Sequence, residues 1–217
     1  MDMKKGILIV LCLLVFGGGV FAQNMAFGGG VMFNLAWTNW SWEDYYYDPY
    51  YMGGVWVTDS WTDSLSRQGF GGFVFLGLGK YAELNFGFLY KNPSKLKYTL
   101  KDDYGFEDSD TIDVNFIDGC LGLQFGIYFK YPFVVSDKLV VFPTAGADFE
   151  LALDESWWND LWIRGGIGLD IFVTQNAFVR VHALYGYGIV IDSDFHSYTD
   201  TLYSHGLLIK AGVGFMF

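Results

Sequence analysis

The last eleven residues of the chain alternate between apolar side chains and side chains that are mostly small. One parity holds Leu207, Ile209, Ala211, Val213, Phe215 and Phe217, and the other holds Leu208, Lys210, Gly212, Gly214 and Met216. A period of two is the period of a β-strand, and about 9–11 residues is the length of a tilted strand that crosses a bilayer. This segment therefore predicts a strand with one face in an apolar medium.

Seven further stretches show the same alternation of apolar residues. They lie at residues 27–37, 69–79, 84–90, 121–129, 139–149, 161–173 and 179–185. The second stretch is apolar at both parities, so the sequence does not say which of its residues point inward. Pro143 lies within the fifth stretch, and because proline has no amide hydrogen it predicts a bulge or local distortion there.

The connections between these stretches alternate between short and long. The short ones are residues 80–81, 131–137 and 174–176, and the long polar ones are residues 39–67, 91–110, 154–160 and 191–205. Short turns on one side and long loops on the other are typical of outer-membrane barrels, in which the short side is periplasmic. We therefore expect an all-β fold, an eight-stranded antiparallel transmembrane up-and-down β-barrel with long extracellular loops.

The first residues predict export. Lys4 and Lys5 precede an apolar run, and Ala22 ends a motif typical of signal-peptide cleavage. We expect residues 1–22 to be a signal peptide and residues 23–217 to form a single barrel domain. The formal net charge of −11, without basic stripes, argues against nucleic acid as a partner.

The charged residues of the strands indicate which face meets lipid. In the stretch at 121–129 the less apolar parity holds mostly small residues, which suit a narrow barrel interior better than a water-exposed surface. With the apolar face outward, the charges and one histidine fall on the inward parity: Glu83, Asp148, Glu150, Arg164, Asp170, Arg180, His182 and Lys210. Arginine or lysine facing lipid near the midplane costs about 2–4 kcal/mol, so this segregation is physically expected. A soluble lipocalin-like barrel is the alternative.

These inward charges are expected to pair, because unpaired buried charges are costly. A turn centred on Gln175 puts Asp170 opposite Arg180, and a loop centred near Ser156 puts Asp148 opposite Arg164. Lys210 is expected to reach Glu83 or Glu150. The sequence therefore predicts a lumen filled by ion pairs. A catalytic cluster is the alternative, but no nucleophile accompanies these charges.

Other candidate chemistry is weaker. Asp194, His196 and Ser197 hold the residue types of an acyl-transfer triad but are neighbours on one polar loop, and His182, His196 and His205 lack a metal-ligand spacing. An acidic run follows no EF-hand pattern and is interpreted as a solvated loop; it comprises Asp102, Asp103, Glu107, Asp108 and Asp110. We expect no enzymatic activity, no metal and no cofactor.

Aromatic residues are concentrated in two places. At the strand ends they predict interfacial girdles, with Trp37, Tyr90, Trp162, Tyr185, Tyr187 and Phe217 as members. The first long loop adds the candidate recognition residues Trp42, Tyr45, Tyr46, Tyr47, Tyr50, Tyr51, Trp56 and Trp61. Two interpretations stay open for this segment: a surface for an extracellular ligand, or an extension of the first two strands above the membrane.

The signal peptide, the eight alternating stretches and the terminal Gly214-Phe215-Met216-Phe217 resemble the small outer-membrane barrel families, namely the OmpA-like transmembrane domain, OmpX and OmpW. The resemblance implies a Gram-negative outer membrane, outer-membrane lipids around the barrel, and periplasmic chaperones and the insertion machinery as partners. It also implies that Phe215 and Phe217 belong to an assembly signal. The expected function is that of a structural or surface-interaction (adhesion-type) barrel acting through its loops, with an OmpW-like channel for small or apolar solutes as the alternative.

Overall fold

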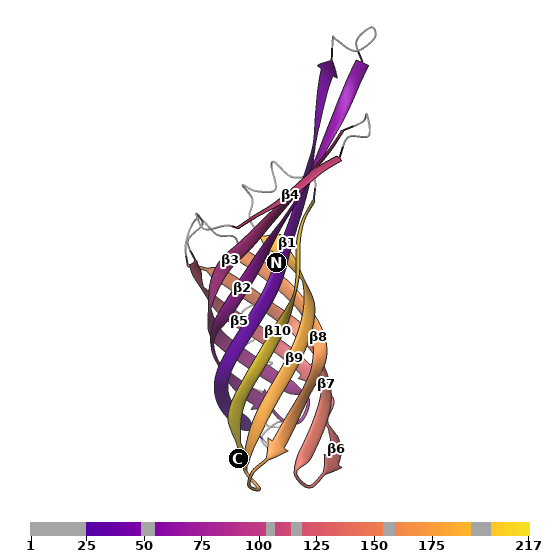
Figure 1. The fold of residues 1–217 in the computed structure, drawn as a ribbon. Helices are drawn as coiled ribbons and strands as arrows, with labels where there is room; N and C mark the ends of the chain where they lie inside the picture. The colour runs from indigo at the N-terminus through magenta and orange to yellow at the C-terminus, as the bar shows by residue number, and fades with distance from the viewer. Residues whose placement is uncertain (1–24, 49–54, 103–106, 114–118, 154–158, 192–200) are drawn as a thin grey trace, which may run out of the picture.

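The described part of the chain folds into one antiparallel sheet that closes on itself (Figure 1). We analyse a computed structural model that describes residues 25–48, 55–102, 107–113, 119–153, 159–191 and 201–217. The strands are β1 Ala26–Asp48, β2 Val55–Leu78, β3 Ala82–Asp102, β4 Glu107–Asp113, β5 Cys120–Lys130, β6 Phe133–Ser136, β7 Leu139–Ala152, β8 Asn159–Phe172, β9 Ala177–Ile191 and β10 Thr201–Met216. No helix long and apolar enough to cross a membrane occurs in these residues.

Eight of the described strands form the ring. β1 pairs with β2 on one side and with β10 on the other, and the remaining neighbours follow in the order β10, β9, β8, β7, β5, β3, β2. β4 pairs only with the upper half of β3, and β6 pairs only with the start of β7. The predicted fold class, an eight-stranded antiparallel up-and-down barrel, is confirmed.

The outward face of the barrel wall is apolar. Outward side chains include Val31, Phe70, Val74, Phe86, Phe125, Ile163, Ile167 and Val213, all exposed. On β8, Ile167 is 56% exposed whereas Arg164, at the opposite parity, is 1% exposed. An apolar belt of this extent around a closed sheet is stable only against hydrocarbon. The barrel therefore lies in a lipid bilayer, and the alternative of a soluble lipocalin-like barrel is wrong.

The inward face combines apolar packing with charge. A buried cluster fills the lumen between the charged groups, and its larger members are Met32, Phe73, Phe75, Leu89, Tyr128, Phe178, Leu184 and Leu208. The parity of β2, which the sequence did not settle, follows from Phe73 and Phe75: its odd residues point inward. An eight-stranded barrel is just wide enough for side chains to fill it.

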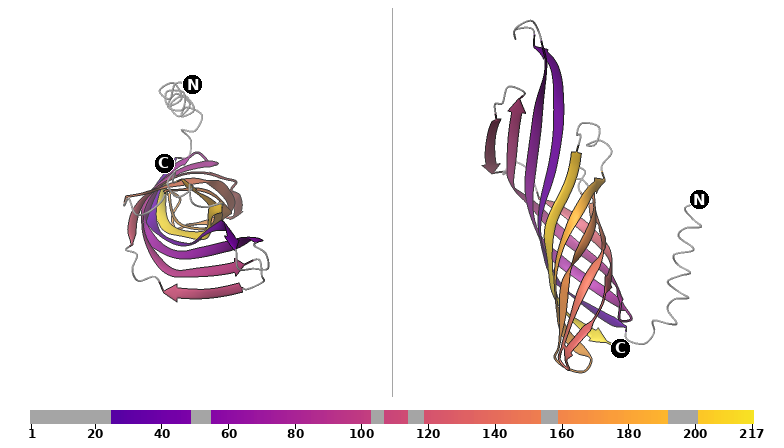
Figure 2. Two further views of the ribbon diagram at one scale, coloured as in Figure 1. Left: turned by 90° about the horizontal axis from the view of Figure 1, so that it is seen from above. Right: turned by 90° about the vertical axis from the view of Figure 1, so that its right-hand side faces the viewer.

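Two of the predicted long loops are mostly strand. β1 and β2 stay in register from Ala26 opposite Gly77 up to Asp48 opposite Val55, so the predicted loop at residues 39–67 is a hairpin that rises beyond the barrel (Figure 1). β3 likewise continues to Asp102 and pairs with β4, which begins within the predicted loop at 91–110. We call the parts of β1–β4 above the barrel ring the extension. Its four strands lie side by side as one sheet (Figure 2).

Pro143 distorts its strand less than predicted. The register between β7 and β8 runs unbroken through Pro143, which lies opposite Ile167, so the expected bulge is wrong. The Pro143 carbonyl faces away from β8 and accepts a hydrogen bond from the Tyr131 amide at 3.1 Å. The Pro143 nitrogen, which carries no hydrogen, therefore faces Tyr131 and Pro132. These residues lie between β5 and β6, where there is no regular ladder of strand hydrogen bonds.

Aromatic side chains lie at the upper rim of the barrel on its outward face. Trp37 of β1 stacks on His205 of β10 with 5.4 Å between ring centroids, and Tyr187 of β9 stacks on Tyr203 at 5.4 Å. This arrangement is typical of an interfacial girdle. Trp162 does not belong to it as predicted, because it has the inward parity of Arg164 and is fully buried.

Candidate functional site: the barrel lumen and the extension above it

The structure places all eight predicted lumen residues inside the barrel. Glu83, Asp148, Glu150, Arg164, Asp170, Arg180, His182 and Lys210 are each at most 7% exposed. Six of them, all but His182 and Lys210, belong to two groups of contacts, one near the extension and one near the short turns. We call these the upper cluster and the lower cluster.

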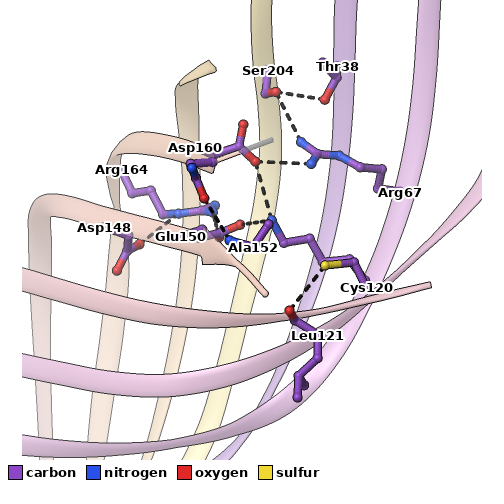
Figure 3. A network of polar contacts seen from close by, with 12 residues as sticks. Thr38, Arg67, Cys120, Leu121, Asp148, Glu150, Ala152, Asp160, Arg164 and Ser204 are labelled. Carbon is purple, nitrogen blue, oxygen red and sulfur yellow. Dashed lines mark hydrogen bonds and ion pairs between the residues drawn. The ribbon is translucent and has the colours of Figure 1, made fainter. Parts of the chain in front are cut away.

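The upper cluster joins β2, β3, β7 and β8 (Figure 3). Arg164 contacts Asp148 at 3.0 Å and Glu150 at 3.1 Å. Lys91 bridges Glu150 at 3.0 Å and Asp160 at 3.5 Å.

Arg67 completes the upper cluster at its top. It contacts Asp160 at 3.1 Å and donates a hydrogen bond to the Ser204 hydroxyl at 3.2 Å (Figure 3). Ser204 is in turn hydrogen-bonded to Thr38 at 2.8 Å. Through these contacts the cluster also reaches β10 and β1, and so crosses the lumen.

The lower cluster centres on Arg180. Its Nε and Nη2 atoms each lie 2.6 Å from one oxygen of Asp170, which is a bidentate pair, and its Nη1 contacts Glu83. Glu83 also accepts from Lys130 at 3.2 Å and from Asn85 at 3.0 Å. The guanidinium of Arg180 lies 4.5 Å from the centroid of the Phe75 ring, so it is packed as well as paired.

Both predicted cross-strand pairs form, but only one does so in the predicted register. Asp170 lies directly opposite Arg180. Arg164 lies opposite Gly146 and not opposite Asp148, so its ion pair with Asp148 is diagonal. The reason is the centre of the hairpin: Glu150 pairs with Asp160, and the midpoint of 150 and 160 is 155 rather than the predicted 156.

Lys210 does not form an ion pair as predicted. Its ammonium donates to the Asn85 amide oxygen at 3.3 Å and lies 5.0 Å from the centroid of the Tyr128 ring. Asn85, which contacts Glu83, thus stands between Lys210 and the predicted carboxylate. His182 packs edge-on against Phe142, with 5.2 Å between ring centroids.

Sequence reasoning missed four charged residues of the lumen. Arg67, Lys91 and Asp160 lie at or near the boundaries of predicted loops, and Lys130 lies beside a predicted turn, so none was assigned to a strand. The rule that inward residues share one parity, extended past the predicted strand ends, would have placed three of them in the lumen. Lys91 is odd-numbered, like the inward Glu83 on the same strand. Asp160 and Lys130 are even-numbered, like the other inward residues of their own strands.

The lumen charges nearly balance. The cations are Arg67, Lys91, Lys130, Arg164, Arg180 and Lys210, and the carboxylates are Glu83, Asp148, Glu150, Asp160 and Asp170, which is six against five. All five carboxylates contact at least one cation. Chemically, this arrangement neutralises charge within the lumen.

The other chemical hypotheses from the sequence find no support. Asp194, His196 and Ser197 lie outside the described residues, as does Asp103 of the acidic run. Glu107, Asp108 and Asp110 lie on the exposed strand β4. Within the part of the chain that the structure describes, no three His, Cys, Asp or Glu residues are grouped so as to hold a metal ion.

The candidate recognition residues of the first hairpin are only partly described. Trp42 and Trp61 are Cα partners, and their rings stack with 6.1 Å between centroids and 13° between planes. The backbones of Tyr45, Tyr46 and Tyr47 belong to β1 and that of Trp56 to β2. Tyr50 and Tyr51 lie outside the described residues.

The candidate assembly signal occupies the barrel seam. Phe215 is exposed on the outward face of β10, and its Cα partner on β1 is Phe27. The Phe217 amide donates to the Met25 carbonyl at 2.9 Å, and its side chain is 81% exposed. Both rings thus lie on the outside, at the end with the short turns.

Comparison with known proteins finds similar solved structures but no close relative. No family model and no curated protein matches the chain. The outer membrane protein OprG of Pseudomonas aeruginosa is 10% identical, with 90% of this chain and 96% of that chain covered and a TM-score of 0.38. The N-terminal barrel domain of Pseudomonas aeruginosa OprF is 13% identical, with 88% and 99% covered and a TM-score of 0.38. The outer membrane protease OmpT of Escherichia coli is 10% identical, with 89% and 96% covered and a TM-score of 0.32.

The assignment of the fold rests on the chain's own geometry. An antiparallel ring of eight strands, an exposed apolar belt, aromatic residues at its upper rim and paired charges inside are together the features of one class of protein. The chain has the fold of a small integral outer-membrane β-barrel.

Proposed function

We propose that this outer-membrane barrel has a closed lumen and acts as a structural or surface-interaction (adhesion-type) protein through its extension. The closed lumen is supported by one observation: all five lumen carboxylates are paired with buried cations. Separating such pairs inside a barrel exposes unpaired buried charge, which costs about 3–5 kcal/mol for one pair. The two clusters therefore favour a lumen that stays filled.

The length of the strands supports the second half of the proposal. A tilted strand needs about 9–11 residues to cross a bilayer, whereas β1 has 23 residues and β2 has 24. About half of each strand thus remains for the space beyond the membrane. Stacked tryptophans and neighbouring tyrosines in that part are residue types that supply much of the energy of protein interfaces.

Assembly partners follow from the same proposal. Phe215 and Phe217, on the outside of the last strand, are expected to be read by the outer-membrane insertion machinery after delivery by periplasmic chaperones. Outer-membrane lipids would then surround the apolar belt.

A narrow conduit for small or apolar solutes is the second candidate function. Its support is a cavity of about 330 Å³ at the end with the short turns, which is lined in part by Tyr131, Phe142 and Arg180. The ion pairs of Arg180 with Glu83 and Asp170 lie at this cavity. A solute that enters the cavity therefore contacts these ion pairs before it can pass further into the lumen. We therefore rank the conduit below the closed barrel.

Planar-bilayer recording tests the closed lumen. The purified full-length mature chain is inserted into the bilayer, with a 16-stranded porin as the conducting control. The proposal predicts that the chain, once inserted, produces no large and persistent current. Steady conductance of the pure protein on the scale of the porin would overturn the closed lumen and favour the conduit.

Removal of the β1–β2 part of the extension tests the interaction role. A variant that joins β1 at Asn39 to β2 at Ser64, which are Cα partners, through a short turn keeps the ring intact. Cells carrying this variant should lose adhesion to surfaces that bind the full chain, while the barrel keeps its heat-dependent shift in gel mobility. Unchanged adhesion would show that the β1–β2 part of the extension has no role in adhesion.

A further inference from the structure

The two faces of the extension carry different side chains. Below the extension, Leu65 and Arg67 of β2 are buried and point inward, so Asp63, Trp61 and Asp59 follow on the same face at steps of two. We call this the inner face, because it continues the lumen side of the barrel wall. The opposite side, which continues the lipid-facing side, is the outer face.

A register shift between β2 and β3 changes which residues of β3 and β4 lie on the inner face. Between Ser66 and Arg67 the pairing with β3 slips by one residue, after which even-numbered residues of β3 lie on the inner face. Leu65 is thus opposite Leu96, and Asp63 is opposite Tyr98. On β4, Asp110 is opposite Tyr98.

Contacts between Cα partners establish this assignment. The rings of Trp42 and Trp61 stack across β1 and β2. Trp40 forms a hydrogen bond with Asp63 across the same strands, and the Tyr98 hydroxyl donates to Asp110 at 3.4 Å across β3 and β4. The inner face therefore presents aromatic and aliphatic side chains, namely Trp40, Trp42, Trp61, Leu96, Tyr98 and Leu100.

Charge is segregated between the two faces. Among the described side chains of the extension, the inner face carries Asp59, Asp63, Asp108 and Asp110 and no cation. The outer face carries both signs, with Lys95 opposite Asp113 and Lys101 opposite Glu107 as Cα partners. The outer face is thus neutralised by its own residues, whereas the inner face is not.

The acidic groups of the inner face lie close to apolar rings. One carboxylate oxygen of Asp59 is buried and has no hydrogen-bond partner in the described residues. Burial raises the pKa of the Asp63 carboxyl, and the hydrogen bond with Trp40 opposes that rise. Among the described side chains this face carries no cation, so a ligand that brings positive charge would neutralise its carboxylates.

We propose that the inner face of the extension binds a cationic polypeptide segment in which Lys or Arg side chains alternate with apolar ones. This inference rests on the proposed surface-interaction role and adds the chemistry of the partner. Basic side chains of the segment pair with Asp59, Asp63 and Asp110, and their aliphatic stems and cationic ends pack on Trp42 and Trp61. The partner's charge complements the inner face, and its apolar side chains cover the aromatic surface.

The spacing of the acidic groups favours a polypeptide over a metal ion. Asp63 and Asp110 lie on strands that are separated by β3, so their backbones are about 10 Å apart at a strand spacing of about 4.8 Å. Aromatic side chains lie between the carboxylates, and no group of three ligands occurs within the described residues. Negatively charged nucleic acids and acidic glycans are repelled by the same face.

Two charge-matched variants test the proposal. The inner variant is Asp59→Asn with Asp63→Asn and Asp110→Asn, and the outer variant is Glu43→Gln with Glu107→Gln and Asp113→Asn. Each removes three negative charges from the extension, and none of the six residues lies in the barrel wall. The heat-dependent shift in gel mobility reports that both variants are folded.

The probe is a fluorescent twelve-residue peptide of alternating Lys and Leu, and the control peptide alternates Glu and Leu. Binding to the full mature chain in phosphatidylcholine nanodiscs is measured by anisotropy at low ionic strength, after subtraction of binding to empty nanodiscs. We expect the Lys–Leu peptide to bind, the inner variant to weaken this binding by about tenfold, and the outer variant to change it by less than about twofold. Binding should also weaken as salt is added.

Three outcomes overturn the proposal. They are the absence of Lys–Leu peptide binding, equal losses in the inner and outer variants, and equal binding of the Glu–Leu peptide. Each leaves the surface-interaction role standing, because that role is tested by removing the β1–β2 part of the extension. If this removal leaves adhesion unchanged while the peptide still binds to the inner face of the full chain, the interaction role of that part fails and the binding surface remains.

Discussion

Within the barrel wall, β2 turns Phe70 and Val74 outward and Arg67 inward, whereas in the extension the same strand turns Thr62 outward and Trp61 inward. The polarity of the outward face is therefore inverted between the two regions of one continuous strand, whereas the inward face carries aromatic residues in both, such as Phe73 and Phe75 in the wall. In the membrane the solvent outside is hydrocarbon, and charges are buried in the lumen. Above the membrane the solvent outside is water, and the outward residues become polar. The comparison teaches that the medium, and not strand propensity, sets the polarity of the outward face.

The largest expected effect comes from breaking the lower cluster. Arg180→Met leaves Asp170 without its bidentate partner and Glu83 with Lys130 as its remaining cationic contact among the described residues, so we expect the free energy of unfolding to fall by about 3–5 kcal/mol. Urea unfolding of the barrel in lipid vesicles, followed by tryptophan fluorescence, measures the change. The control is Lys97→Met on the outer face of the extension, with an expected change below about 0.5 kcal/mol. Equal effects of the two substitutions would refute a charge-paired lumen.

An arginine scan on one face of β2 tests the inversion itself. Val74→Arg puts a cation into lipid and should lower the free energy of unfolding by about 2–4 kcal/mol. Thr62→Arg, at the same outward parity but in the extension, should change it by less than about 0.5 kcal/mol. The same urea titration serves both variants. If both variants were equally destabilised, the boundary between the two regions would be misplaced.

A smaller effect is expected from the stacked tryptophans of the extension. Trp42→Ala removes the ring pair with Trp61, and such pairs contribute about 0.5–1.5 kcal/mol beyond the area that they bury. Near-ultraviolet circular dichroism should lose the coupled signal of the two indoles while the barrel stays folded. Phe70→Ala, an outward substitution in the barrel wall, is the control that should keep this signal. Its loss in both variants would argue against a local pair.

The smallest effect is predicted for Lys210. Its ammonium has an amide partner, Asn85, and no carboxylate within ion-pair distance in the described residues, so Lys210→Met leaves no buried carboxylate unpaired. We expect a change in the free energy of unfolding within about 1 kcal/mol, well below that of Arg180→Met. A loss as large as that of Arg180→Met would mean that Lys210 neutralises a carboxylate after all.

Alternation was sufficient to predict the barrel wall. Strict parity in segments such as 207–217 gave the strands, the closed fold and the inward position of the charges that were assigned to them. The pairing of Asp170 with Arg180 followed because a short turn fixes the register. The partner of Lys210 was not predictable, since several inward groups lie within reach of a long flexible side chain.

The extension was harder to predict for a physical reason. Once β1 and β2 leave the membrane, their outward residues become serine, threonine and asparagine, which are also typical of loops. On β1 the apolar parity changes from odd, as in Leu35 and Trp37, to even, as in Trp40 and Trp42. A search for one apolar parity along the strand therefore ends at this point. Arg67 of β2 and Lys91 of β3 lie where the extension begins and were assigned to the predicted loops, whereas Asp160 lies at the edge of the loop predicted before β8.

Spin-label accessibility along β2 tests the inversion most directly. Single cysteines at Val74, Phe70, Thr62 and Ser60, all of outward parity, are introduced into a Cys120→Ser background and labelled in lipid bilayers. The account predicts that labels at Val74 and Phe70 are relaxed by oxygen and shielded from a water-soluble nickel reagent, and that labels at Thr62 and Ser60 show the reverse. Labels at Val74 and Phe70 that are as accessible to the nickel reagent as the label at Thr62 would contradict it.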